Sequence, residues 1–279
     1  RLERSPAASN GRCRMGDLSS AAMSDISVGR LAGAEFVGTT IVMLGGPGLL
    51  VVAGDEIGTL GVAVGFGAAI AIAIGVIGAV ANPMFSLALW FSRGIGTREL
   101  FSDWLGQFLG GIFGGALIFG LNDTTRYTAG VNGWDSGRLD EGVDLGVSLS
   151  GYSDLGVVLA AELIIGTIVV VVLLSAITQQ RSSGAAAAFT GLAYAVGTMF
   201  LLGISGAGMN PARSLGAAVF ADTDPNALGR VWAFILVPVL ASFAGTLIWL
   251  AIDDATIDDT VFDDTFLEDV SDAVTNDAD

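Results

Sequence analysis

Two Asn-Pro pairs, Asn82-Pro83 and Asn210-Pro211, each stand between apolar stretches of the chain. Asparagine is a good N-cap and proline is accepted at the first position of a helix, so each pair predicts a break followed by a short helix. Arg213 follows the second pair, and an arginine at membrane depth is costly unless it faces water or a partner. Amides, a guanidinium and irregular backbone in such a place indicate a water-filled path.

Each of these residues also has a simpler interpretation. Asn82 and Asn210 could be plain helix caps, and Arg213 could be paired with a buried acid. The Asn-Pro pair occurs once in each half of the chain, and this favours the pore interpretation. In that interpretation each asparagine amide donates a hydrogen bond to the oxygen of a passing molecule.

The composition is that of a polytopic membrane protein. Of 279 residues, 52% are hydrophobic and 40 are glycine, and the mean hydropathy of +0.69 is too high for a soluble domain of this size. Acidic residues outnumber basic ones 28 to 12, and lysine is absent, which favours a protein bathed in high salt and excludes nucleic acid as a partner. With no histidine and one cysteine, Cys13, we expect no enzyme activity, cofactor or metal.

The apolar stretches predict an all-α membrane protein, in which six helices span the bilayer and two re-entrant half-helices do not. We expect a leader in residues 1–27, disordered or preceding the true start of the protein, and a channel domain in 28–252. The first repeat is 28–121, an external loop is 122–154, and the second repeat is 155–252. Residues 253–279 hold eleven acidic residues and are expected to be a disordered tail. The expected spans are 28–53, 57–78, 99–121, 155–177, 185–203 and 228–252, and the half-helices are 83–91 and 211–220.

The two halves repeat. Glu35, in an Ala-Glu-Phe triplet, lies 47 residues before Asn82, and Glu162, in an Ala-Glu-Leu triplet, lies 48 residues before Asn210. Each half has three spans, and because this number is odd the second copy must cross the membrane in the opposite orientation. Inverted repeats of this kind place their binding sites near the membrane midplane. Two half-helices of roughly 14 Å then cover the core of about 30 Å, and their positive N-termini meet at its centre.

The glutamates have three possible roles. Glu35 and Glu162 could be polar packing groups, proton carriers, or braces that accept hydrogen bonds from the re-entrant loops, and we favour the last. Backbone carbonyls of these loops should form a ladder of acceptors for water, because irregular backbone at this depth needs it. The expected carbonyls are those of Gly78, Ala79, Val80, Gly206, Ala207 and Gly208.

The arginines predict the orientation. If the N-terminus is cytoplasmic, eight arginines fall on the inner side of the membrane and three on the outer side. The positive-inside rule therefore places both termini in the cytoplasm.

The run from Ser205 to Ser214 resembles the second Asn-Pro-Ala signature of the major intrinsic protein family, the aquaporins and aquaglyceroporins. The resemblance extends over about residues 28–252. Glu35, Glu162, Gln107 and Pro238 also fit the family pattern. It implies the aquaporin fold and a passive channel for water and small uncharged solutes such as glycerol, which excludes protons and ions. It also implies a homotetramer in the lipid bilayer of the cell membrane.

Several residues depart from the family pattern. Met84 stands where the first signature has alanine, Val80 where many members have histidine, and Ile77 where they have serine. The family's outer filter would fall on Val62, Thr198, Ala207 and Arg213. These residues include neither the bulky aromatic nor the histidine of strict water channels, so we expect a wide filter with one cation.

A secondary transporter is the main alternative, because it would share inverted repeats and broken helices. We expect such a protein to show titratable or ion-ligating groups at the midplane, whereas the two breaks here present amides and an arginine. Saturation of uptake and its coupling to a gradient would separate the transporter from the channel.

Overall fold

The protein is described by a computed structural model covering residues 28–122, 127, 130–134, 153–179, 182–223 and 226–253. The regular elements of these residues are all helical, so the expected all-α membrane fold is confirmed. The expectations for residues 1–27, for most of the loop 122–154 and for residues 254–279 lie outside the described residues.

The elements follow the order expected from the apolar stretches. The first half contains α2 (Val28–Met43), a π-helical segment (Leu44–Gly48), α3 (Leu49–Ile72), a second π-helical segment (Ala73–Ile77), α4 (Pro83–Phe91) and α5 (Thr97–Leu121). The second half contains α7 (Leu155–Thr178), α8 (Ser183–Ser205), α9 (Pro211–Ala218), a 3-10 turn (Leu228–Arg230) and α10 (Ala233–Ile252).

The helical residues from Val28 to Ile77 form two spans. A straight helix of 50 residues would measure about 75 Å, far more than the hydrocarbon core. Gly58 has φ 62° and ψ −174°, which no helix allows, and the chain turns back there. A Cβ on Gly65 would lie 2.9 Å from the carbonyl oxygen of Gly45, so the two limbs pack together. With the four other long apolar helices, the two limbs give six spans within the described residues.

Glycines on two faces of α5 let two other helices approach its backbone. A Cβ on Gly110 would lie 2.4 Å from the carbonyl oxygen of Phe36 in α2. On the other face, a Cβ on Gly115 would lie 2.1 Å from the carbonyl oxygen of Gly216 in α9. Small residues allow such close packing of helices in lipid, and here they hold the half-helix α9 against a spanning helix.

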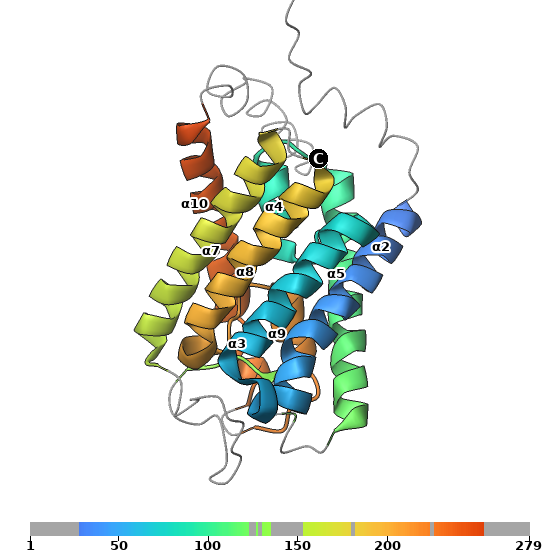
Figure 1. The fold of residues 1–279 in the computed structure, drawn as a ribbon, viewed down its shortest axis with the longest axis vertical. Coiled ribbons are helices and arrows are strands. Elements are labelled where there is room, and N and C mark those ends of the chain that lie inside the picture. The colour runs from blue at the N-terminus through green and yellow to red at the C-terminus, as the bar shows by residue number, and fades with distance from the viewer. Residues whose placement is uncertain are drawn as a thin grey trace, which may run out of the picture.

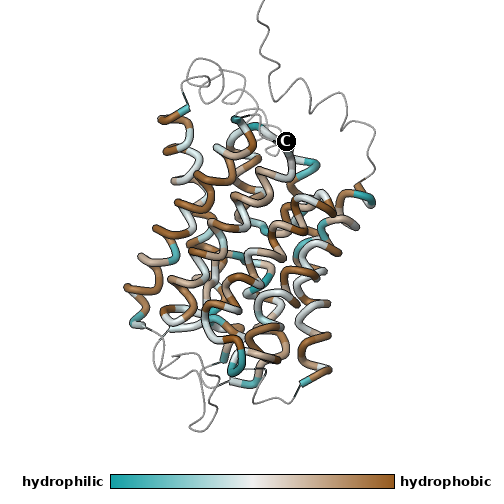
Figure 2. The backbone as a smooth tube through the Cα atoms, in the orientation of Figure 1, coloured by the Kyte–Doolittle hydropathy of each residue, from teal (hydrophilic) through white to brown (hydrophobic). Residues whose placement is uncertain are grey.

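The long helices stand side by side, and α2 begins at the same end of the molecule at which α10 ends (Figure 1). Brown, hydrophobic positions run along these helices, and teal positions gather at their ends and at a few interior points (Figure 2). Large apolar side chains such as Val64, Leu192 and Val196 are more than half exposed. An apolar exterior of this kind suits contact with lipid.

Candidate functional site

The two Asn-Pro pairs meet inside the molecule. Asn82 Nδ2 donates to the carbonyl oxygen of Met209 at 3.2 Å, and Asn210 Nδ2 donates to the carbonyl oxygen of Ala81 at 2.8 Å. Both asparagines are fully buried. The structure thus brings together the two residues that the sequence pairs across its repeat. Each amide nitrogen carries two hydrogens, so one remains for another acceptor.

The same asparagines also cap the half-helices. Asn82 Oδ1 accepts from the backbone N–H of Met84 at 3.0 Å, and Asn210 Oδ1 accepts from that of Arg213 at 3.1 Å. Cap and inter-loop bond together fix both ends of each amide. The simpler interpretation as caps is therefore correct as far as it goes, but it does not account for the contact between the two loops.

Both loops leave their helices through a left-handed glycine. Gly78 has φ 75° and Gly206 has φ 82°, four residues before their respective asparagines. Ala81 at φ 53° and Ala207 at φ 60° are also left-handed, which is strained for a residue with a Cβ. Such strain persists only where the surroundings hold the backbone firmly.

The carboxylate of Glu35 helps to fix the backbone of the first loop. Its Oε1 accepts from the N–H of Val80, and its Oε2 accepts from the N–H of Ala81, each at 2.8 Å. Gln107 Nε2 in α5 donates to the same Oε2 at 2.8 Å. Glu35 is 4% exposed, so these bonds form away from solvent.

The brace at Glu35 continues into a polar chain that the sequence analysis missed. Gln107 Nε2 also donates to Ser86 Oγ at 2.8 Å, and Ser86 Oγ donates to Asp103 Oδ2 at 3.0 Å. Ser86 is in the half-helix α4 and Asp103 is in α5. Neither residue belongs to a recognisable motif. Only the folding of the chain brings them beside Glu35.

Glu162 holds the second loop in a different way. A single oxygen, Oε1, accepts from both Ser205 Oγ and the N–H of Gly208. The other oxygen, Oε2, is buried and has no hydrogen-bond partner among the described residues. The two glutamates therefore occupy matching places in the repeat, but only Glu35 uses both of its oxygens.

Arg213 is almost fully buried and is held by backbone and by a loop side chain. Its Nη2 donates to the carbonyl oxygen of Gly206 at 2.9 Å, and its Nη1 donates to Asn132 Oδ1. Ser214 Oγ donates to the same Asn132 oxygen at 2.8 Å. Asn132 comes from the loop after α5, and nothing in its sequence surroundings distinguishes it from other polar loop residues.

A second residue of this loop, Tyr127, holds the far end of α9. Its hydroxyl donates to the carbonyl oxygen of Ala217 at 2.9 Å, next to the last residue of the helix. Burial raises the pKa of Tyr127 above the ordinary tyrosine value, so the hydroxyl is a proton donor across the neutral range, as it already is in a free tyrosine. No sequence motif marks this contact either.

The carbonyls of the two loops differ in their partners. Gly206 accepts from Arg213, and the carbonyl oxygen of Gly208 lies 3.5 Å from Ser214 Oγ. For the other four carbonyls of the expected ladder, no donor from the described residues is found. These four are Gly78, Ala79, Val80 and Ala207.

The expected filter residues Val62, Thr198 and Ala207 are each 1% exposed. The aromatic ring beside the guanidinium belongs to Phe66, four residues after Val62, and its centroid is 5.9 Å from Arg213 Cζ. No aromatic residue is expected in this region from the motif positions. Val62 is chosen by its distance along the sequence from Asn82. That distance does not reveal the direction of the Phe66 ring, which depends on how the helices pack.

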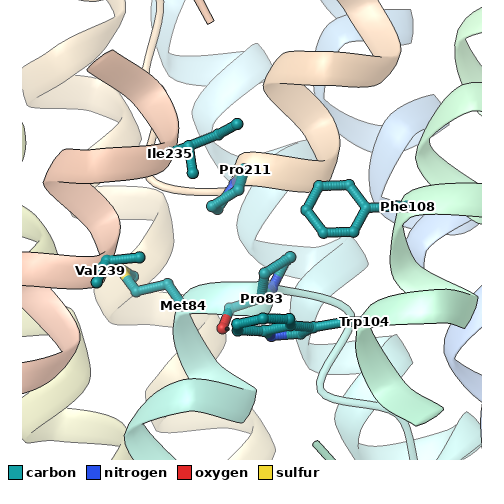
Figure 3. A pocket seen from close by; sticks show the side chains of 7 residues that line it. All are labelled: Pro83, Met84, Trp104, Phe108, Pro211, Ile235 and Val239. Atoms are coloured by element: carbon teal, nitrogen blue, oxygen red, sulfur yellow. Dashed lines mark hydrogen bonds between the residues drawn. The ribbon is translucent and has the colours of Figure 1, made fainter. Parts of the chain in front are cut away.

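Met84 lies beside an apolar cavity of about 80 Å³ between α5 and α10 (Figure 3). The figure shows Pro83 and Pro211 facing each other across it, with Trp104 and Phe108 from α5 on one side and Val239 on the other. A Cβ on Gly166 of α7 would lie 3.4 Å from Met84 Sδ. The side chain therefore extends between α7 and α10.

The chain matches the model of the family described as "Major intrinsic protein" over residues 22–249. It is 30% identical over 231 residues to Aquaporin Z of Brucella melitensis biotype 1, covering 77% of this chain and 94% of the relative. Aquaporin Z of Photorhabdus laumondii is 27% identical with the same coverage. The X-ray structure of the aquaglyceroporin from Plasmodium falciparum has a similar fold, with a TM-score of 0.61, 20% identity, and coverage of 84% of this chain and 99% of that chain. The chain therefore belongs to the major intrinsic protein family.

Proposed function

We propose that this protein is a passive channel for water and small uncharged solutes such as glycerol, and that it excludes protons and ions. Its family makes it a membrane channel and not an enzyme. The observation that carries the proposal is the reciprocal bonding of Asn82 and Asn210, which fixes two amide donors at one point inside the membrane.

The residues around this point supply what a passing water molecule needs. The second N–H of each asparagine amide donates to the water oxygen, and the carbonyls of Gly78, Ala79, Val80 and Ala207 accept its hydrogens. These groups replace the hydrogen bonds that water loses on leaving bulk solvent, so the barrier to entry is low. Gly206 and Gly208 complete the ladder with their remaining lone pairs.

Charge excludes cations from the same path. The half-helices α4 and α9 direct their N-termini toward each other, and each N-terminus carries about half a positive charge. Arg213 adds a full positive charge near the second loop. A proton or sodium ion at the asparagines would therefore be repelled from both sides.

Two further features belong to the proposal. Both termini lie on the cytoplasmic side of the cell membrane, which agrees with the distribution of arginines and with the shared end of α2 and α10 (Figure 1). Residues 28–252 form the channel unit, and four copies assemble in the bilayer, as the family resemblance implies.

Solute uptake into reconstituted vesicles tests the proposal against a transporter. Uptake of glycerol and urea should rise linearly with concentration, without saturation, and should not change when sodium or proton gradients are imposed. A pH-sensitive dye inside the vesicles should report no proton entry. Saturable uptake driven by an ion gradient would contradict the proposal and favour a transporter.

A further inference from the structure

We infer that the narrowest point of the channel is a stacked pair of aromatic rings, Phe66 and Tyr194, and that this pair decides which solutes pass. The inference rests on the proposed function. It moves the selective point from Val62 and Thr198 to residues one helical turn away on the same two helices, α3 and α8.

The two rings form a close parallel stack. Their centroids are 5.1 Å apart and their planes differ by 6°. Phe66 is 2% exposed and Tyr194 is fully buried. A Cβ on Gly46 would lie 1.5 Å from Phe66 Cε2, so the ring fills the space left by a glycine on the neighbouring span. The position of Phe66 is thus fixed from two sides.

The inverted repeat explains why these two residues meet. Phe66 lies sixteen residues before Asn82, and Tyr194 lies sixteen residues before Asn210, so they hold equivalent positions in the two halves. Equivalent residues that contact each other lie at the pseudo-two-fold axis that relates the repeats. The two asparagines also meet at this axis. The stack therefore lies at the depth of the asparagine pair.

The backbones of α3 and α8 approach closely at the neighbouring positions. A Cβ on Gly67 would lie 2.3 Å from the carbonyl oxygen of Gly191, and a Cβ on Gly191 would lie 2.5 Å from that of Gly67. Small residues allow helices to pack this closely. Phe66 and Tyr194 are buried beside this contact, and they share a packed cluster with Ala207 and Met209 of the second re-entrant loop.

The ends of the stack contact residues that are themselves equivalent. The Phe66 ring lies 5.9 Å from Arg213 Cζ, and the Tyr194 ring meets the Phe85 ring edge-on at 6.1 Å and 86°. Arg213 and Phe85 are each three residues after their asparagine. The layer of rings thus extends from the guanidinium beside one loop to the first turn of the opposite half-helix.

Two hydroxyls mark the path along this layer. Tyr194 Oη and Thr198 Oγ1 are buried, and neither has a hydrogen-bond partner among the described residues. They lie one helical turn apart on α8. An unpaired buried hydroxyl is unfavourable, and water moving past the rings would satisfy both groups. The rings themselves offer no hydrogen bonds and leave little width for a larger solute.

The test replaces each ring alone and measures water and glycerol permeability in the same vesicles. Phe66→Leu and Tyr194→Leu should each raise the ratio of glycerol to water permeability by about tenfold or more, because pockets commonly discriminate by size to this extent. Val62→Ala should change the ratio less. Val64→Leu and Val196→Leu, on the exposed outer sides of α3 and α8, are matched controls and should leave it unchanged.

A third variant tests the hydroxyl separately. Tyr194→Phe keeps the stack, so it should lower water permeability while glycerol remains slow, and it should fold even where a leucine variant does not. The inference is overturned if the ratio stays at the parent value in both leucine variants, or rises more in Val62→Ala. It is also overturned if Tyr194→Phe leaves water permeability unchanged. If the parent passes no water at all, the proposed function fails instead, so the two failures are distinguishable.

Discussion

Asn82 and Asn210 each donate to the backbone of the other's loop, at 3.2 Å and 2.8 Å, so neither loop can move without disturbing the other. The strained residue Ala81 carries one of the two acceptors, and the strained residue Ala207 lies two residues before the other, Met209. A buried polar network of this kind is stable only while every member keeps its partners. The groups that hold the two loops are therefore where substitutions should have the clearest effects.

The glutamates provide a matched comparison. In the parent, both carboxylate oxygens of Glu35 accept hydrogen bonds from N–H groups. Glu35→Gln replaces one of these oxygens with an NH₂ group, which cannot accept, so at least one buried N–H loses its partner. The variant should therefore be less stable by about 1–3 kcal/mol. Glu162→Gln should be milder, because one oxygen accepts both of its hydrogen bonds and the other has no partner among the described residues.

Thermal unfolding in detergent and the yield of folded protein measure this difference. Equal melting temperatures for the two variants would contradict the assignment of unequal braces. The pH dependence of water flux should be the same in both variants as in the parent. A new pH dependence would indicate proton carriage by the glutamates, the alternative to bracing.

Asn132→Ala tests whether a loop residue positions the filter arginine. Loss of this side chain removes one partner from Arg213 and one from Ser214, so the guanidinium should lose its fixed position. Water permeability should fall several-fold while the amount of folded protein stays near that of the parent. Asn122→Ala is the control, because that side chain binds the carbonyl of Ile118 at the end of α5. Equal permeability in the two variants would count against the assignment.

The close contact between α5 and α9 predicts a sharp difference between two glycines of one helix. Gly115→Ala places a Cβ 2.1 Å from the carbonyl oxygen of Gly216, so the half-helix must shift, at a cost of about 1–3 kcal/mol. Gly120→Ala meets nothing within 4 Å and should be tolerated. The melting temperatures of the two variants in detergent give the comparison. Similar values would mean that α9 is not held against α5.

Much of the architecture could be predicted from the sequence because it depends on local chemistry. Apolar length gave the spans, and the Asn-Pro pairs placed the starts of both half-helices, at Pro83 and Pro211. The predicted last span, 228–252, agrees with the apolar span of the structure, although residues 228–230 form a 3-10 turn and α10 begins only at Ala233. The Arg230 side chain there donates to the carbonyl oxygen of Trp134, a loop contact that hydropathy does not reveal.

The contents of the site were harder to predict than its position. Asn132 and Asp103 reach it only through tertiary packing, and no motif marks them. The Phe66–Tyr194 stack depends on how closely α3 and α8 approach, which is set by glycines whose contacts cannot be read from spacing. The side chain of Met84, the residue that departs from the first signature, extends between α7 and α10 and lines an apolar cavity (Figure 3), a placement that its position in the motif does not reveal.

The excess of acidic residues predicts a dependence on salt. The formal net charge of −16, with no lysine, produces self-repulsion that salt screens, and the Debye length falls to about 3 Å at 1 M. The melting temperature in detergent should rise with potassium chloride up to molar concentrations. A chain ending at Ile252 lacks eleven acidic residues and should gain less. A melting temperature that does not change with salt in the full chain would contradict adaptation to high salt.

Osmotic water flow tests the channel assignment most directly. Vesicles containing the purified, folded protein should shrink in a stopped-flow light-scattering experiment much faster than bare lipid vesicles. The activation energy should be low, close to that of water diffusion, because the asparagine pair and the loop carbonyls replace the hydrogen bonds that water loses. A rate and activation energy equal to those of bare lipid, with the protein shown to be inserted and folded, would contradict the account.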